Sequence, residues 1–235
     1  MCVSSRWWCR GSTGPSAPAP ACGGANRRPT LKCSPSTLGG GAPVSTTTRK
    51  QSHHHGNLRE ALVEAGIALL EAGDAFSLRA VARQVGVSQT APYRHFPDRS
   101  HLEAAMATTG FVRLRRRLEG VLAHPEPAAS VLTGLAVATV RFAAENPALY
   151  TLMFSRYCGA DDARLPASAE VFDLLQRAAT RHFPGVDAHH LATAGWTMTH
   201  GLASLHLSGQ LRAATPSELD DRVAGAFSAV LAAHP

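Results

Sequence analysis

The chain has 235 residues, 45% of them hydrophobic and 17% charged, enough for a packed core in one large domain or two small ones. Its net charge of +6 does not describe a basic body, because residues 1–50 carry seven basic and no acidic side chains, which leaves −1 for the remainder. The composition therefore excludes a folded body that holds nucleic acid by a large excess of positive charge.

The positions of the cysteines and of the apolar residues argue against a disulfide-bonded, a cysteine-metal or a membrane-spanning protein. Four of the five cysteines lie in the first 33 residues and only Cys158 follows, so the body can form neither an internal disulfide nor a cysteine metal site. This usage is typical of a reducing compartment, and a cytoplasmic location is predicted. No apolar run is expected to span a bilayer, and no signal peptide is expected.

Residues 1–52 are predicted to be a disordered, low-complexity basic tail. Its Pro, Gly and Ser clusters bury too little apolar surface to offset the entropy of ordering. Two further interpretations apply to this segment. Val44 could be the natural start, encoded by GTG, or the tail could be an arm that touches DNA phosphates.

Two helices are predicted at residues 58–72 and 78–85. Apolar residues recur with helical period in both, and Gly73 follows the first as a terminator. Ser77 is placed to cap the second helix, and Gly86 is placed to end it in the left-handed conformation.

A third, very short helix is expected between Ser88, its predicted cap, and Phe96. Pro92 would lie in the first turn, where a proline loses at most one hydrogen bond, and Pro97 would end the helix because the residue before a proline avoids helical geometry. A short helix after a tight glycine turn is typical of a helix-turn-helix, in which it is the recognition helix.

The motifs of residues 53–105 resemble the N-terminal domain of the tetracycline-repressor (TetR) family. They are His-His-Gly-Asn-Leu-Arg at 54–59, Ser-Leu-Arg-Ala-Val-Ala at 77–82, Gly-Val-Ser at 86–88 and Tyr-Arg-His-Phe-Pro-Asp-Arg at 93–99. The resemblance implies an all-α, dimeric regulator of about nine helices. It places a three-helix helix-turn-helix DNA-binding domain at 53–110 and a larger effector-binding and dimerisation domain at 111–235.

Side-chain chemistry and the resemblance together give the expected DNA contacts. Gln89 can pair with adenine, and the methyl groups of Thr90 and Ala91 can touch the methyl of thymine. The resemblance places Tyr93 and His95 on phosphates, which position the protein without reading sequence. The complete set expected at the DNA is Arg79, Ser88, Gln89, Thr90, Ala91, Tyr93, Arg94, His95 and Arg99.

Structural alternatives stand beside these roles. Tyr93 could be a half-buried packing residue, and Arg94 and His95 could face solvent. Residues 51–110 carry five arginines against six acids, so binding would depend on charge gathered on one face and on helix N-termini.

Other basic residues are not expected to contact the DNA bases. The adjacent histidines 53–55 are expected near the phosphates and not at a metal, because neighbouring side chains point in different directions. No metal site and no cofactor are predicted. Four arginines are assigned to a solvated or interdomain face of the fourth helix: Arg113, Arg115, Arg116 and Arg117.

The fourth helix is followed by five more, predicted at 127–145, 148–156, 163–182, 187–207 and 216–233. Residues 191–205 are apolar or small nearly all round, which predicts a helix with the core on one face and a partner subunit on the other. Trp196, His200 and Gly201 resemble the Trp-His-Gly signature of one C-terminal domain class of the family. The family also implies dimerisation through the last two helices.

An effector pocket is predicted from aromatic and neighbouring residues of this half. Its expected lining is Phe142, Tyr150, Met153, Phe154, Phe172, Trp196 and His200. The alternative is that Trp196 and His200 are core residues whose polar atoms are satisfied by neighbours.

The sequence thus predicts a homodimeric repressor that a small-molecule effector releases from a palindromic operator in double-stranded DNA, with no membrane partner. No enzymatic activity is predicted, because the chain has no nucleophile elbow, P-loop or zinc-protease motif. The alternatives are a helical interaction protein or a helical enzyme with a vestigial DNA-binding head.

Overall fold

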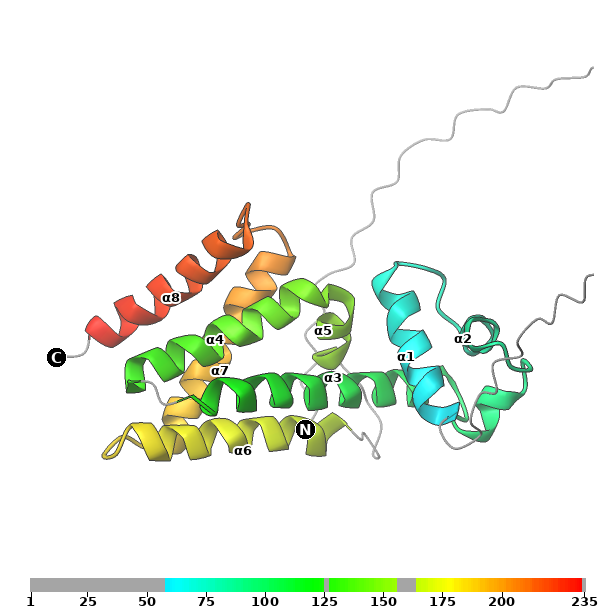
Figure 1. Ribbon diagram of the computed structural model, residues 1–235, viewed down its shortest axis with the longest axis horizontal. Helices are drawn as coiled ribbons and strands as arrows, with labels where there is room; N and C mark the ends of the chain where they lie inside the picture. Colours follow the sequence, from blue (N-terminus) through cyan, green and yellow to red (C-terminus); the bar gives the residue numbers. More distant parts are fainter. Residues whose placement is uncertain (1–57, 125–126, 156–163, 234–235) are drawn as a thin grey trace, which may run out of the picture. The chain divides into compact units, whose positions relative to one another are not determined.

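The structure is a computed structural model that describes residues 58–124, 127–155 and 164–233. These residues form eight α-helices and one 3-10 helix, with no strand among them, so the predicted all-α fold is confirmed (Figure 1). They belong to one compact unit, residues 52–235. The predicted tail, the histidines at 53–55 and Cys158 lie outside the described residues.

The first two helices, α1 (Leu58–Glu71) and α2 (Leu78–Val85), end as the sequence predicts. The Ser77 hydroxyl accepts the Ala80 N–H at 3.1 Å, which satisfies one of the free donors at the start of α2. Gly86 has φ of 77°, a left-handed conformation that residues with a β-carbon rarely adopt.

The helix predicted to be the recognition helix is shorter and tighter than expected, because it is the 3-10 helix η1 (Ala91–Arg94). Pro92 has no N–H to give to the Ser88 carbonyl in an α-helical bond, and that carbonyl accepts the Ala91 N–H instead, at 3.0 Å. The prediction that the Ser88 side chain caps the helix is wrong. The Ser88 hydroxyl lies 3.3 Å from the hydroxyl of Thr90 and caps no backbone N–H.

Helix α3 (Arg99–Leu122) is continuous through 24 residues, and the predicted domain boundary at 110/111 falls inside it. Its first part packs on α1 and its last part runs between later helices (Figure 1). Five helices follow: α4 (Ala128–Glu145), α5 (Pro147–Met153), α6 (Arg164–His182), α7 (Ala188–Leu207) and α8 (Pro216–Ala232).

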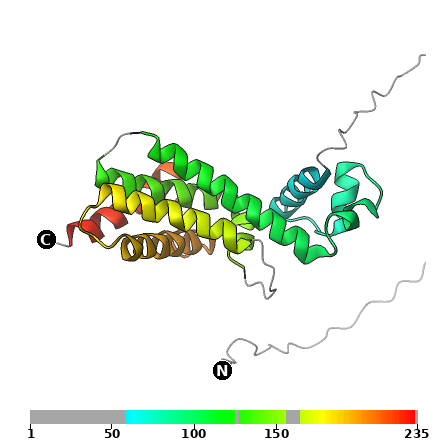
Figure 2. The same ribbon diagram turned by 90° about the horizontal axis from the view of Figure 1, so that it is seen from below.

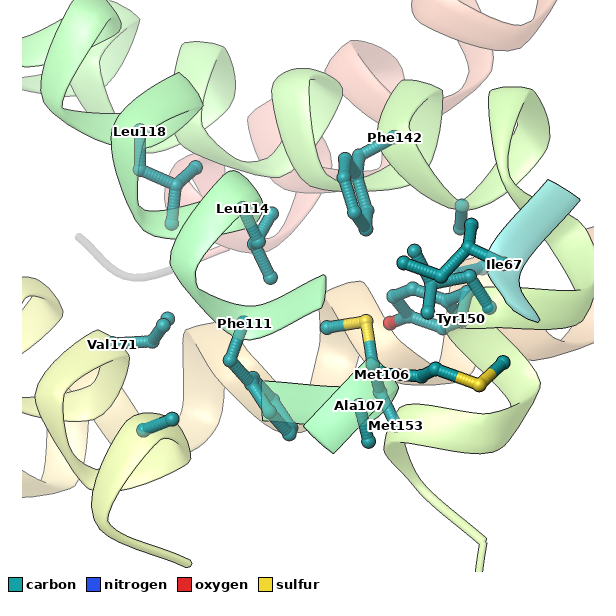
Figure 3. Close-up of a cluster of buried hydrophobic side chains, with 14 of the residues drawn as sticks. Ile67, Met106, Ala107, Phe111, Leu114, Leu118, Phe142, Tyr150, Met153 and Val171 are labelled. Carbon is teal, nitrogen blue, oxygen red and sulfur yellow. The ribbon is translucent and has the colours of Figure 1, made fainter. Parts of the chain in front are cut away.

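Helices α3, α4, α6 and α7 surround the main core. Helix α4 packs on α3, α7 and α8, and α6 packs on α3 and α7, which Figure 2 shows from a second side. Figure 3 shows side chains of α3 at the centre of this core, with residues of α4, α5 and α6 around them. The labelled core residues that are less than a tenth exposed include Phe111, Leu114, Leu118, Phe142, Met153 and Val171.

Helix α4 corrects one expectation about apolar runs. Its 18 residues, with a mean hydropathy of 1.3, are long and apolar enough to cross a bilayer by length and composition. The same helix lies between α3, α7 and α8 and gives Val131, Leu135 and Phe142 to the buried core. Its place in that core accounts for its apolar composition without a membrane.

Helix α5 sits closely against α3 because Gly110 has no side chain. A β-carbon at Gly110 would lie 2.6 Å from the sulfur of Met153, closer than real contacts allow. This close contact between the two helices fixes the position of α5, which carries Tyr150, a residue that lines the cavity described below.

Candidate DNA-binding surface and ligand cavity

Two buried residues anchor the segment that is expected to meet DNA. Pro92 is buried within η1, and Phe96, just after it, is only 1% exposed. The guanidinium of Arg59 on α1 lies 5.1 Å from the centre of the Phe96 ring and covers it. The apolar positions thus face inward, so the polar residues between and around them face outward.

The residues expected at the DNA are exposed, apart from half-buried Ala91: Arg79, Ser88, Gln89, Thr90, Tyr93, Arg94, His95 and Arg99. Tyr93 is 48% exposed, and its hydroxyl has no hydrogen-bond partner among the described residues. A tyrosine kept for packing would more often satisfy its hydroxyl within the fold. Its exposure leaves that hydroxyl available to an outside acceptor.

Arg99 is held more closely to the protein than its neighbours are. Its Nε donates to Glu103 at 2.7 Å, and its guanidinium lies 4.9 Å from the centre of the Phe76 ring. Both contacts compete with a phosphate for the same side chain. Arg79 and Arg94 have no such partner among the described residues and are therefore stronger candidates than Arg99 for binding a DNA phosphate.

Asp98 fixes the start of α3 next to this segment. Its carboxylate accepts the Ser100 hydroxyl at 2.5 Å, lies 2.9 Å from Nδ1 of His101 and accepts the His101 N–H at 3.1 Å, and these contacts hold the pKa of Asp98 well below its ordinary value. A lowered pKa means that the cap stabilises the fold above the unfolded pKa of about 3.9. This stabilisation is lost as the pH falls through the lower pKa of the folded state.

Asp98→Ala is therefore expected to lower the melting temperature at pH 7, with a smaller difference from the unmodified protein at pH 2.5. Thermal unfolding followed by circular dichroism at the two pH values measures both differences. Asp98→Asn is the matched control, because an amide also caps a helix but does not titrate in this range. A difference between wild type and Asp98→Ala that is constant with pH would contradict this account of the cap.

The arginines along the outer part of α3 are used within the fold. Arg113 pairs with Glu64 of α1, Arg115 donates to Glu170 of α6 at 2.5 Å, and Arg117 donates to Glu145 of α4 at 2.9 Å. The Arg117 guanidinium lowers the pKa of Glu145. These pairs join α3 to three other helices, in keeping with the interdomain or solvated face that the sequence predicts.

Sequence reasoning missed Glu71, which joins the first helices to α5. Its two carboxylate oxygens accept the N–H groups of Ala148 and Leu149, at 3.2 and 2.8 Å. A carboxylate at the end of α1 is unfavourable for that helix, but it is favourable at the start of α5, where backbone N–H groups point outward. The sequence signal was an acid in the last turn of a helix, although nothing in the sequence identified its partner.

A cavity of about 50 Å³ lies among α3, α4, α6 and α7, with one residue from each of α5 and α8. Helix α3 contributes Leu114 and Leu118. The rest of its lining is Val131, Leu132, Leu135, Ala136, Thr139, Tyr150, Phe154, Val171, Leu175, Ala178, Ala179, Phe183, Leu191, Ala192, Gly195, Trp196, Thr199, His200 and Phe227. Pockets between helices of this apolar kind are typical sites for small molecules.

Four of the seven residues predicted for an effector pocket line this cavity, and three do not. Tyr150, Phe154, Trp196 and His200 come together, with the Phe154 ring 4.3 Å from the His200 ring and 6.1 Å from the Trp196 ring. Phe142 and Met153 are buried core residues, the latter against Gly110.

Phe172 does not line the cavity, and its ring lies 6.2 Å from that of Trp196, which does. The aliphatic lining was not predicted, because a leucine facing a cavity and a leucine in the core follow the same helical pattern.

The polar end of the cavity is built on a hydrogen bond between the Tyr150 hydroxyl and Nδ1 of His200, at 3.1 Å. Burial raises the pKa of Tyr150 and lowers the pKa of His200, so both rings are held in their uncharged forms near neutral pH. Thr199 is 7% exposed and lines the same region, and no described residue hydrogen-bonds with its hydroxyl.

The outer face of α7 is not covered by any described residue. Only Ala192, Thr199 and Ala203 of this helix are buried, although most of its residues are apolar or small. The exposed residues that share one side are Ala194, Thr197, Ser204 and Leu205. A β-carbon at Gly201 would meet no atom within 4 Å, so this part of the helix has space in front of it.

The described residues contain no cluster of three or more His, Cys, Asp or Glu side chains that could hold a metal ion.

Comparisons with known proteins cover both halves of the described chain. The tetracyclin repressor-like C-terminal domain family matches residues 132–230. The structure is similar to that of a protein of unknown function from Rhodococcus sp. RHA1, with 32% sequence identity and a TM-score of 0.65. That similarity covers 76% of this chain and 97% of the other.

Two similar structures belong to regulators. A transcriptional regulator of the TetR/AcrR family from Thermobifida fusca is 17% identical, with a TM-score of 0.56, over 72% of this chain and 95% of that one. The TetR family transcriptional regulator PfmR from Thermus thermophilus is 17% identical, with a TM-score of 0.53, over 73% and 94%. These two structures show that the chain shares their fold, and the match of residues 132–230 and the helix-turn-helix motifs support its resemblance to the tetracycline-repressor (TetR) family.

Proposed function

We propose that the protein is a cytoplasmic, homodimeric repressor that binds a palindromic operator in double-stranded DNA and leaves it when a small molecule enters the cavity. We assign DNA binding to residues 53–110, and effector binding and dimerisation to residues 111–235. The observation that carries the proposal is the outward-facing segment 89–95, which the buried Pro92 and Phe96 hold within a TetR fold.

Base reading is assigned to the residues at the start of η1. Gln89 and Thr90 are exposed and directly precede η1. An amide can make two hydrogen bonds to adenine, and a threonine methyl can touch thymine. A single 3-10 turn presents few such side chains, which favours limited direct reading of bases and more contact with the backbone.

Phosphate binding is assigned to exposed Tyr93 and His95, with Arg79 and Arg94 beside them. Tyr93→Phe is expected to weaken binding to every DNA sequence by about three- to tenfold, because it removes one hydrogen bond to a DNA phosphate. Gln89→Ala is expected instead to relax the preference at one base pair in each half-site.

Selection of bound fragments from a random DNA pool, followed by fluorescence anisotropy, measures both effects. A selected palindrome with half-sites one helical turn or more apart supports a dimeric DNA-binding regulator. If both variants changed affinity and preference in the same way, the division of roles between Gln89 and Tyr93 would be wrong. The absence of any enriched sequence would defeat the DNA-binding proposal.

Dimerisation is assigned to α7 and α8. The small residues on the outer face of α7 permit a second helix to approach closely, and Leu205 and Val230 are exposed apolar residues on these two helices. A two-fold operator also requires two copies of the DNA-binding residues. We therefore place the partner subunit against this face.

Effector control is assigned to the cavity because of its position along α3. Leu114 and Leu118 line it, and the same helix begins at Arg99 beside the DNA-binding segment. A ligand that separates the cavity walls acts on a rigid element that reaches the head. The ligand shifts the balance between the DNA-binding conformation and the ligand-bound conformation, to the extent that its affinities for these two conformations differ.

A further inference from the structure

No described residue that lines the cavity is an Asp, Glu, Lys or Arg, and the lining changes in chemistry along α7. Leu191, in its aliphatic part, precedes His200 by nine residues, which is roughly 13 Å along the helix. His200 belongs to the polar end, with the ring of Phe154 and with Tyr150, to which His200 is hydrogen-bonded. The end with Tyr150 is the one next to α5, since that helix supplies the residue. An occupant would therefore meet apolar surface along its body and polar atoms at one end only.

The polar end has one hydroxyl group that the fold leaves unused. Thr199 is more than nine-tenths buried and lines the cavity, and its hydroxyl has no hydrogen-bond partner among the described residues. Thr139, the other threonine of the lining, donates to the Leu135 carbonyl of its own helix at 2.9 Å. The Thr199 oxygen is not among the fully buried side-chain atoms that lack a partner, so it keeps accessible surface, and a ligand atom in the cavity can bond to it.

The absence of charge decides between ligand classes. Among the described residues, no Lys or Arg lines the cavity to pair with a carboxylate or phosphate, and no Asp or Glu lines it to pair with an ammonium group. Burial also favours the uncharged forms of the two titratable residues there, Tyr150 and His200. An ion that enters loses its hydration without gaining a countercharge, whereas an uncharged group loses little.

We propose that the effector of this protein is an uncharged, elongated, mainly apolar molecule with one terminal hydroxyl or carbonyl group, and that Thr199 is the residue that binds this group. The proposal rests on the effector-binding role assigned above and specifies its chemistry. Tyr150 and His200 complete the polar end, and the aliphatic residues hold the body of the ligand.

The size of the cavity bears on how such a ligand binds. About 50 Å³ of space holds a few water-sized molecules, while sites for larger ligands are usually several times greater. Entry of a chain of six to eight carbons therefore has to widen the space between the surrounding helices. Each methylene that is buried contributes to the affinity, so longer chains bind more tightly until the cavity can widen no further.

Titration calorimetry with the full chain tests the class of ligand. The probes are octan-1-ol, sodium octanoate and octylammonium chloride at pH 7.5, which share a chain length and differ in the charge of the terminal group. Octan-1-ol is expected to bind at least about tenfold more tightly than either ion, because only the ions lose a full hydration shell. Hexan-1-ol is expected to bind more weakly than octan-1-ol, by about fourfold for each methylene removed.

Two threonine variants test the assigned contact. Thr199→Val keeps the shape of the side chain and removes the free hydroxyl, so it is expected to weaken octan-1-ol binding by about three- to tenfold. Thr139→Val is the matched control in the same cavity, and its effect is expected to stay within about twofold because its hydroxyl bonds to its own helix. Thermal unfolding of both variants checks that each retains the fold.

The outcomes separate this inference from the proposed function. Octanoate or octylammonium binding as tightly as octan-1-ol would overturn the inference, as would equal effects of the two threonine variants. A chain that selects an operator but binds none of the probes would overturn the inference and leave the DNA-binding role in place. The expected order of probes in a chain that selects no DNA would support the cavity chemistry and overturn the regulatory function.

Discussion

Phe96→Ala is expected to lower the free energy of unfolding by about 3–5 kcal/mol, the range found when a buried phenylalanine is truncated to alanine. Phe96 is 1% exposed, and it closes the apolar side of the segment that carries Tyr93 and His95. The substitution removes the ring on which Arg59 rests and leaves a cavity beneath η1. Loss of operator binding is expected at temperatures where the rest of the chain is still folded.

Urea unfolding followed by circular dichroism measures the stability of this variant, at one fixed protein concentration because dimers gain stability by mass action. Fluorescence anisotropy with the selected operator measures binding. Phe96→Leu is the control, since it keeps most of the apolar volume and is expected to cost less than about 1.5 kcal/mol. A loss of under about 1 kcal/mol in Phe96→Ala would show that this ring does not support the DNA-binding segment.

Gly201→Arg is expected to prevent the proposed dimerisation without harming the fold of the single chain. A β-carbon at Gly201 meets no atom within 4 Å, and arginine favours helix more than glycine does, so the single chain tolerates the change. Against a second copy of α7, the long charged side chain would prevent close approach. Without a linked second head, operator affinity is expected to fall by about a hundred- to ten-thousandfold.

Sedimentation velocity measures the mass of the Gly201→Arg species, and anisotropy measures its affinity for the palindrome and for a single half-site. Gly120→Arg is the matched control, because Gly120 lies on α3 with equally open space in front of it. The control is expected to remain a dimer. A Gly201→Arg protein that sediments as a dimer and binds the palindrome normally would place the partner subunit on another surface.

The sequence predicted the helices well because their ends are determined by near neighbours. Ser77 and Gly86 act within three or four residues of their own positions, and prolines such as Pro147 and Pro216 favour the first turn of a helix. The observed bounds of α6, α7 and α8 therefore lie within one or two residues of the predicted ones. The type of the short helix before Phe96 was predicted wrongly. Pro92 lacks an N–H, and this one missing donor decides between the α-helical and the 3-10 hydrogen-bond pattern.

The candidate sites could be predicted only in part, for a related reason. The exposed residues around η1 follow from local pattern and family motifs, and their contact with DNA stays a prediction. The cavity depends on residues far apart in the chain, such as Tyr150 bonded to His200, and Leu118 and Phe183 in one lining. Aromatic composition pointed to four lining residues, but the same reasoning included Phe142, which fills the core.

Glu71 has a consequence for how the two halves of this chain influence each other. Its carboxylate, at the end of α1, holds the first N–H groups of α5, and α5 carries the Tyr150 ring into the cavity. A shift of α5 by about an ångström is enough to break both hydrogen bonds, because their strength falls steeply with distance. If ligand entry shifts α5 in this way, the ligand lowers the affinity of the protein for the operator. Thermodynamic reciprocity then requires the operator to lower the affinity for the ligand by the same factor.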